Sequence, residues 1–318
     1  MQALSITATA APALRRAWPK ALRAIGMLHA RSADAMLLDR LAAHDLQGRV
    51  HSVFERVINI EADDGGLYTL SCSALDDAPR SAVIDVPRLG AECAAVGDAV
   101  EARGHRLVVG PRMTVSFASA IAWDAELDDY PAMDATLRAN GRRLRKLLAE
   151  AGACGGMVAD PRRDDRFATA VSALLRQRAE AVCDALVRGD AAEAATHACT
   201  LIGLGPGLTP SGDDFLVGLL AVLNVAGSPL QACRAPLAAA VIDSRDATNA
   251  ISHAALAEAA HGRVRASIAA LVGAAMRCTP PALDAAARRV LAIGATSGTD
   301  IALGIVSAFE AGLRAACR

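Results

Sequence analysis

Residues 203–216 constrain the fold of this chain more than any other segment. They read Gly-Leu-Gly-Pro-Gly-Leu-Thr-Pro-Ser-Gly-Asp-Asp-Phe-Leu, and an apolar stretch without charge, 215–226, follows directly. Glycine permits left-handed backbone angles and close approach to a ligand, and loops held by a rigid scaffold often carry function. The pattern therefore predicts a tightly bent loop that leads into a buried helix.

The loop matches neither of the familiar phosphate-binding motifs. A P-loop ends in Gly-Lys-Ser/Thr, whereas Gly212 is followed by Asp213. A dinucleotide fingerprint follows a strand, whereas Gly203, Gly205 and Gly207 follow a predicted helix and enclose a proline. Both readings are therefore excluded.

Ser211 stands where it could cap the helix, with Asp213 and Asp214 in its first turn, where the helix dipole favours carboxylates. A cap and a tight turn explain part of this pattern, but a cap needs only one serine. If the loop binds an anion, the aspartates oppose it unless Mg²⁺ lies between them. Alternatively, an aspartate binds an amine or amide of the substrate, and the sequence leaves both options open.

Residues 294–304 repeat the pattern as Gly-Ala-Thr-Ser-Gly-Thr-Asp-Ile-Ala-Leu-Gly. With Pro210 treated as a one-residue insertion, the Gly, Thr, Ser, Gly, Asp and later Gly of 207–218 all align with those of this second segment. Each segment leads into a helix, and the residues that follow the segment's last aspartate, 215–226 and 301–309, carry no charge. We interpret them as an internal repeat of a loop–helix unit and expect the two loops to face one another across a cleft.

A third segment, Thr-Asn-Ala-Ile-Ser-His, covers 248–253. Thr248 or Asn249 is best explained as a helix cap. His253 is then a surface or core histidine, although it is the histidine we would test as a proton carrier.

The rest of the chain predicts an α+β fold with two domains. Apolar residues make up 53% of the chain and aromatic residues only 3%, so alanine, the best helix former, contributes much of the apolar content. Residues 1–130 form a helix-flanked β-rich domain, a small antiparallel sheet or barrel, and 131–318 form a larger all-α domain carrying the Gly-rich loops. Strands are expected at 50–60, 67–72, 82–86, 99–102, 106–109 and 113–121.

Two helices are expected before the strands, within 13–45, and Ser32 is expected to cap the second of them. Further helices are expected at 133–151, 164–188, 190–201, 213–226, 229–243, 249–261, 263–276, 281–293 and 299–316.

Charge and cysteine content argue against several classes of protein. With 33 basic and 34 acidic residues, no strong field favours nucleic acid or an anionic membrane. The eight cysteines lack Cys-x-x-Cys spacing, which indicates free thiols rather than a zinc site. No signal peptide or membrane-spanning run is recognised, and a cytoplasmic location is expected.

Together, the Gly-Leu-Gly-Pro-Gly-Leu-Thr-Pro-Ser-Gly-Asp-Asp-Phe-Leu run, Thr-Asn-x-Ile-Ser and Gly-Ala-Thr-Ser-Gly-x-Asp-x-x-x-Gly resemble the AllH-type subunit of oxamate carbamoyltransferase, over about 190–312. The resemblance implies a multi-subunit enzyme of allantoin and purine-nitrogen catabolism that converts oxalurate and phosphate into oxamate and carbamoyl phosphate. Thr299 departs from the aromatic residue of some relatives, which leaves the shape of the pocket there open.

Carbamoyl transfer suits the chemistry of these loops, since backbone amides can hold phosphate and an oxyanion. The catalytic candidates are Asp213, Asp214 and Asp300, with Mg²⁺ at the first two if a metal is used. The candidates for binding substrate or phosphate are Gly203, Gly205, Gly207, Thr209, Ser211, Gly212, Asn249, Ser252, Thr296, Ser297 and Gly298.

Two alternatives remain at this point. The chain could be a non-catalytic subunit that binds a small carboxylate or a partner surface, or a Mg²⁺-dependent phosphoryl or acyl transferase acting on another acid. The expected partners are the other subunits of a carbamoyltransferase complex.

Overall fold

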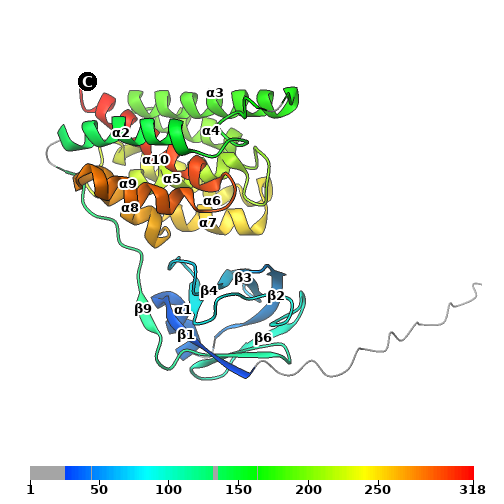
Figure 1. The fold of residues 1–318 in the computed structure, drawn as a ribbon. Coiled ribbons are helices and arrows are strands. Elements are labelled where there is room, and N and C mark those ends of the chain that lie inside the picture. The colour runs from blue at the N-terminus through cyan, green and yellow to red at the C-terminus, as the bar shows by residue number, and fades with distance from the viewer. Residues whose placement is uncertain (1–25, 44, 132–134, 163) are drawn as a thin grey trace, which may run out of the picture.

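The computed structural model describes residues 26–43, 45–131, 135–162 and 164–318. Strands occupy the first part of this chain and helices the second, as Figure 1 shows. The α+β class predicted from the sequence is therefore confirmed. The helix expected near residue 18 lies outside the described residues, and the domain boundary near residue 130 remains a prediction.

The N-terminal region is a closed barrel of eight strands with one further strand beside it. Neighbouring strands follow the order β5-β4-β3-β2-β6-β7-β8-β1-β9, and pairing of β5 with β1 closes the ring. The strands are β1 (Gly26–Asp34), β2 (Gln47–Val53), β3 (Val57–Ala62), β4 (Leu67–Cys72), β5 (Ser81–Ile84), β6 (Ala99–Ala102), β7 (Arg106–Val109), β8 (Met113–Ser116) and β9 (Ile121–Trp123). Closure leaves β9 as the edge strand of this sheet.

Alternating side chains explain why these short segments form a barrel. Along β6 and β7, exposed or half-buried residues alternate with buried ones, the period of a strand with one face in a core. The barrel core includes Ile58, Ile60 and Leu107, and Leu37 and Leu41 of helix α1 (Ala35–Ala42) pack into it.

Several details of the predicted β-region were wrong. The expected strand at 50–60 is two strands, because the chain turns where the Phe54 amide bonds the Val57 carbonyl at 2.8 Å. The strand expected at 113–121 is likewise divided into β8 and β9. Ser32 lies inside β1 rather than at a cap, and Asp34 occupies the N-cap position of α1. The sheet is mixed, since β1–β8, β1–β9 and β4–β5 are parallel.

The helical region follows the predicted order closely. Its helices are α2 (Ala135–Ala151), α3 (Arg166–Arg188), α4 (Ala191–Leu201), α5 (Ser211–Leu223), α6 (Arg234–Asp243), α7 (Ala250–Ala260), α8 (Ala266–Arg277), α9 (Pro280–Leu291) and α10 (Ser297–Ala315). Helix α5 is buried along its whole length, as its uncharged sequence predicts. None of the described helices is long and apolar enough to cross a membrane.

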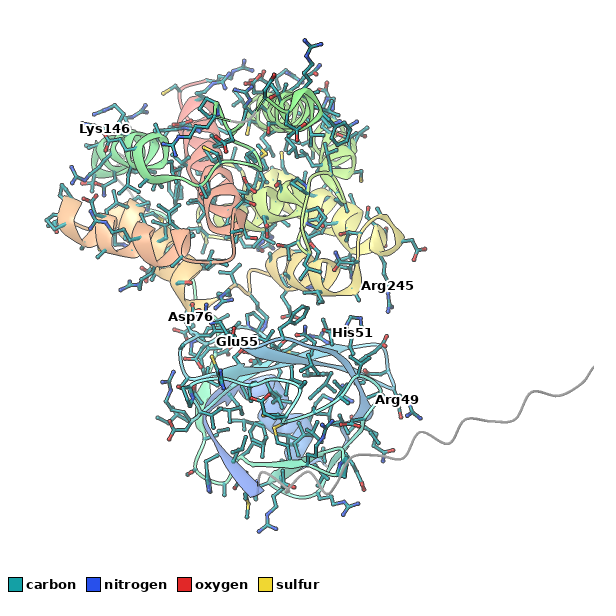
Figure 2. All side chains as sticks on the ribbon, turned by 45° about the vertical axis from the view of Figure 1, so that its right-hand side comes forward. Arg49, His51, Glu55, Asp76, Lys146 and Arg245 are labelled. Atoms are coloured by element: carbon teal, nitrogen blue, oxygen red, sulfur yellow. The ribbon has the colours of Figure 1, made fainter. Side chains whose placement is uncertain are left out.

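Ion pairs join the barrel to the helices. Arg263, just before α8, contacts Asp34 of the barrel at 2.6 Å, Asp124 at 2.7 Å and Glu258 of α7 at 3.0 Å. Glu258 also binds Arg80 of the barrel at 2.5 Å. Figure 2 shows side chains of both regions meeting along this boundary, where the β3–β4 turn also approaches Arg245.

Candidate functional site

Helices α5 and α10 cross at two glycines, and the contacts are reciprocal. A Cβ atom on Gly218 would lie 2.0 Å from the carbonyl oxygen of Ile301, and one on Gly304 would lie 2.0 Å from that of Phe215. Each residue of α5 thus has its counterpart 86 positions later in α10. Reciprocal contacts of this kind are those of a local two-fold axis, as in the interface of a symmetric dimer.

The loops before these helices also correspond, although not in the predicted register. The carbonyl of Pro210 accepts the amides of the third and fourth residues of α5, and the carbonyl of Thr296 does the same in α10. Pro210 therefore corresponds to Thr296 and is not an insertion. The extra residues of the first loop lie earlier, because Gly205 and Gly294, both with positive φ, pack on the first serine of each helix.

A hydroxyl pair joins the two loops directly above a carboxylate. Thr209 Oγ1 donates to Asp214 Oδ2 at 3.0 Å and lies 3.0 Å from Ser297 Oγ. Thr209 and Ser297 are half-buried, whereas Asp214 is buried beneath them. Burial raises the pKa of Asp214 to about 7; the two hydroxyls oppose this rise, and the charges of Asp300 and Asp213 add to it. A carboxyl with such a pKa can exchange protons near neutral pH.

Asp300 is enclosed more completely than its counterpart. Its Oδ1 accepts the Met157 amide at 2.8 Å, and its Oδ2 and the Ser211 hydroxyl are buried without a hydrogen-bond partner among the described residues. Both atoms lie against Gly156, where a Cβ would come within 2.3 Å of Asp300 Oδ2 and 2.7 Å of Ser211 Oγ. Burial raises the pKa of Asp300 to about 6, against the effect of the Met157 amide and of the nearby Ser211 and Thr296 hydroxyls.

The segment 152–158 was missed by the sequence analysis. Besides holding Asp300, it bonds the first turn of α10 through Ala153, whose amide donates to Thr299 Oγ1 at 2.8 Å. Its glycines at 152, 155 and 156 were a usable signal, but the segment has no counterpart in the repeat. The Thr299 hydroxyl thus supports this segment from within the protein.

Asp213 points away from the hydroxyl pair and ties three segments together. Its Oδ1 accepts the Gly203 amide at 2.8 Å, and its Oδ2 accepts the hydroxyls of Thr248 at 2.5 Å and Ser252 at 2.6 Å. Both oxygens are occupied within the protein. The arrangement makes Asp213 a clamp between the first loop and α7, and its predicted catalytic role remains a prediction.

Asn249 caps α7, as predicted, and also holds the first loop. Its Oδ1 accepts the amides of Ile251 and Ser252 at 3.1 Å, and its Nδ2 donates to the Leu208 carbonyl at 2.7 Å. His253 faces elsewhere, with Nε2 3.1 Å from the Ile242 carbonyl.

The second, third and fourth amides of both helices are already bonded within their own loops. The amides of Gly212 and Gly298 donate to the Leu204 and Ile293 carbonyls at 2.9 and 3.0 Å. These two glycines are also packing positions, since a Cβ on either would lie 2.0 Å from a carbonyl oxygen of the preceding helix. Ser211 is the first residue of α5 and makes no cap bond, so its predicted capping role was wrong.

Other amides of the first loop remain available to a ligand. Those of Gly205, Gly207 and Leu208 make no hydrogen bond within the described part of the chain, and residues 206–208 are exposed. The loop itself thus offers backbone donors that are suited to bind an anion.

The donor set does not fit Mg²⁺. Asp213 faces α7 while Asp214 faces Thr209, so the two carboxylates do not present oxygens to one point. Among the described residues, no group of three or more His, Cys, Asp or Glu side chains could hold a metal ion. Magnesium takes a near-octahedral set of oxygen ligands, and no step below depends on it.

Comparison with known proteins covers both regions. The family described as oxamate carbamoyltransferase subunit AllH matches residues 201–309, including both loops, and the AllH family N-terminal domain matches 29–122, the barrel. No solved structure matches the chain. The barrel match adds to the resemblance, which rested on the helical region alone. Since the two matches cover most of the chain, the protein belongs to the AllH family of oxamate carbamoyltransferase subunits.

Proposed function

We propose that the meeting point of the two loops is the transfer site of an oxamate carbamoyltransferase, which converts oxalurate and phosphate into oxamate and carbamoyl phosphate in allantoin and purine-nitrogen breakdown. One observation carries the proposal: the Asp214 carboxyl lies beneath Thr209 and Ser297, and burial raises its pKa to about 7. General acid–base catalysis is most effective when the pKa lies near the working pH.

The reaction requires one proton to move and no net gain or loss of protons. An oxygen of HPO₄²⁻ attacks the terminal carbamoyl carbon of oxalurate and forms a C–O bond. The C–N bond to the oxamate nitrogen then breaks, and the phosphate proton passes to that nitrogen. In this proposal the Asp214 carboxyl gives its proton to the leaving nitrogen and recovers one from phosphate, with Thr209 and Ser297 between it and the substrate.

The first loop supplies donors for the negative charge. The amides of Gly205, Gly207 and Leu208 lack partners in the described chain, and Gly207 and Leu208 are exposed. They are suited to hold a phosphate oxygen or the oxyanion of the tetrahedral intermediate. Asp300 is assigned a supporting role, because its charge raises the pKa of Asp214 from beneath the site.

The test is phosphorolysis of oxalurate by the complex purified through a tag on this chain. Asp214→Asn should lower kcat at least about tenfold, which corresponds to roughly 1.4 kcal/mol of lost transition-state stabilisation. The matched control is Asp243→Asn, at an exposed position on α6, which should leave kcat unchanged. Equal kcat for wild type and Asp214→Asn would remove this residue from the mechanism.

A second candidate is a non-catalytic subunit whose first loop recognises a partner. Leu208, at the tip of this loop, is 64% exposed, and the loop contains neither lysine nor arginine to offset a phosphate charge. In that case phosphate or oxamate would leave the melting temperature of the isolated chain unchanged, and Leu208→Ser would weaken assembly of the complex while Asp214→Asn left activity intact.

A further inference from the structure

A cavity of about 620 Å³ lies between α2, α3 and α10, apart from the loop site. This volume is within the range of pockets that hold small molecules. Apolar side chains of Met157, Phe215 and Leu303 contribute to its lining. Thr209, Asp214 and Ser297 do not line it, so the cavity is a different place from the proposed transfer site.

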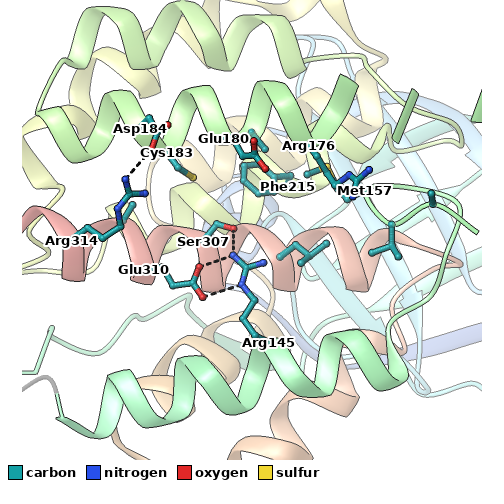
Figure 3. Close-up of a pocket in the computed structure, with 15 residues that line it drawn as sticks. Arg145, Met157, Arg176, Glu180, Cys183, Asp184, Phe215, Ser307, Glu310 and Arg314 are labelled. Carbon is teal, nitrogen blue, oxygen red and sulfur yellow. Dashed lines mark hydrogen bonds and ion pairs between the residues drawn. The ribbon is translucent and has the colours of Figure 1, made fainter. Parts of the chain in front are cut away.

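Most of the charged groups around this cavity are paired with one another. Arg145 binds the two carboxylate oxygens of Glu310 at 3.0 and 2.7 Å and the Ser307 hydroxyl at 2.9 Å. Arg314 pairs with Asp184 at 3.1 Å. Figure 3 shows these pairs on facing helices around the opening. The two pairs leave the net charge of the cavity balanced.

Arg176 and Glu180 are the exceptions. Both line the cavity, and neither side chain makes an ion pair or hydrogen bond within the described chain. They lie one turn apart on α3, which places their Cβ atoms on the same helix face. Figure 3 shows them close to Met157 and Phe215. Both residues are exposed, so the cavity offers an unpaired cation and an unpaired anion on its solvent side, beside an apolar lining.

We propose that this cavity is a second ligand site, which binds a small organic acid that carries an N–H donor and an apolar group. The guanidinium of Arg176 would bind the carboxylate with two parallel hydrogen bonds, the geometry for which arginine is suited. Glu180 would accept the N–H of an amide or ammonium group, and the apolar group would cover Phe215 and Leu303. A purely anionic ligand would leave Glu180 facing it, and a purely cationic one would leave Arg176 unused.

The test is titration calorimetry on the isolated full-length chain, with N-acetyl-L-leucine as the probe. This compound combines a carboxylate, an amide N–H and an apolar side chain. Two matched probes each lack one group: N-acetyl-L-leucinamide lacks the carboxylate, and 4-methylpentanoate lacks the amide. Each should bind at least about tenfold more weakly than N-acetyl-L-leucine, the effect of losing a hydrogen bond to a charged group.

Variants separate the cavity from general charge effects. Arg176→Gln should weaken binding of N-acetyl-L-leucine at least about tenfold, and Arg176→Lys should retain part of it. Arg166→Gln removes the same charge from α3 outside the cavity and should bind like wild type. Since Arg176 is exposed, unchanged melting curves should show that its variants remain folded.

Two results would overturn the proposal: no saturable binding of N-acetyl-L-leucine at millimolar concentration, or equal affinity for wild type and Arg176→Gln. The proposal does not rest on the transfer reaction. Asp214→Asn should bind the probe as wild type does, so failure at one site is distinguishable from failure at the other.

Discussion

The two loop–helix units share a backbone plan but differ in what surrounds their carboxylates. In the first, 202–210 form a longer loop, and Asp214 lies just below the half-buried hydroxyls of Thr209 and Ser297. In the second, 292–296 form a shorter loop, and Asp300 is covered by the Met157 amide and Gly156. The comparison indicates that Asp214, in the first unit, stays close to solvent, whereas Asp300, in the second unit, is enclosed and supports the site from inside the protein.

The largest expected effect concerns Asp214 and pH. Its pKa is raised from 3.8 to about 7, so the unfolded chain ionises first, and stability falls as pH rises from about 4 to 7 and is level above that. Asp214→Asn removes this cost and should raise the free energy of unfolding by on the order of 4 kcal/mol at pH 8. Urea titrations at pH 4 and pH 8 measure the difference; a gain of equal size at both would contradict the assignment. Asp243→Asn is the control.

Asp300→Asn should also raise the free energy of unfolding as pH rises, but over a narrower pH range. Its pKa of about 6 makes the gain on the order of 3 kcal/mol, complete near pH 6 rather than pH 7. The same titrations at half-unit intervals compare the two profiles. If the profiles of Asp214→Asn and Asp300→Asn level off at the same pH, the two carboxyls titrate as a coupled pair. The difference between the two loop–helix units would then not hold.

The crossing of α5 and α10 is the feature the two copies should share. Gly218→Ala and Gly304→Ala each place a Cβ 2.0 Å from a carbonyl oxygen, which the backbone can relieve only by moving. Each should lower the free energy of unfolding by about 2–3 kcal/mol, and by similar amounts. Gly141→Ala in α2, where nothing lies within 4 Å of the added atom, is the control and should stabilise slightly. A large difference between Gly218→Ala and Gly304→Ala would argue against a symmetric crossing.

The smallest expected effect comes from a change at Thr209, where the two loops are in contact. Thr209→Val removes the hydroxyl that joins Asp214 to Ser297 and should cost about 1 kcal/mol of stability. Because this hydroxyl lowers the pKa of Asp214, its loss should also move the pH dependence of kcat upward. Thr196→Val, whose hydroxyl bonds only within α4, is the control. An unchanged pH profile of kcat would show that the Thr209 hydroxyl does not influence the titration of Asp214.

Much of this site could be predicted because it is repeated within the chain. Two copies of Gly-Thr-Ser-Gly-Asp indicated facing loops before any contact was known, and glycine turns indicated β6 and β7 with correct bounds. The register of the loops could not be predicted, since Thr209 and Thr296 align by residue type although Pro210 occupies the equivalent backbone position.

What could not be predicted depends on contacts between distant residues. Pairing of β1 with β5, which closes the barrel, joins residues about fifty positions apart and leaves no local pattern. Asp213 and Asp214 are neighbours of the same type, and only the fold gives one a clamp role and the other a place below the hydroxyls. The cover over Asp300 comes from 152–158, which lies outside the repeat.

The Arg263 contacts have a consequence for assembly. One guanidinium binds carboxylates of the barrel, of the connecting segment and of α7, and rotation of the barrel against the helices would break its contact with Asp34 together with the Arg80–Glu258 pair. A neighbouring subunit would therefore meet both regions already fixed in position. Association would lose little additional freedom at this boundary, which favours a tighter complex than two loosely tethered parts would form.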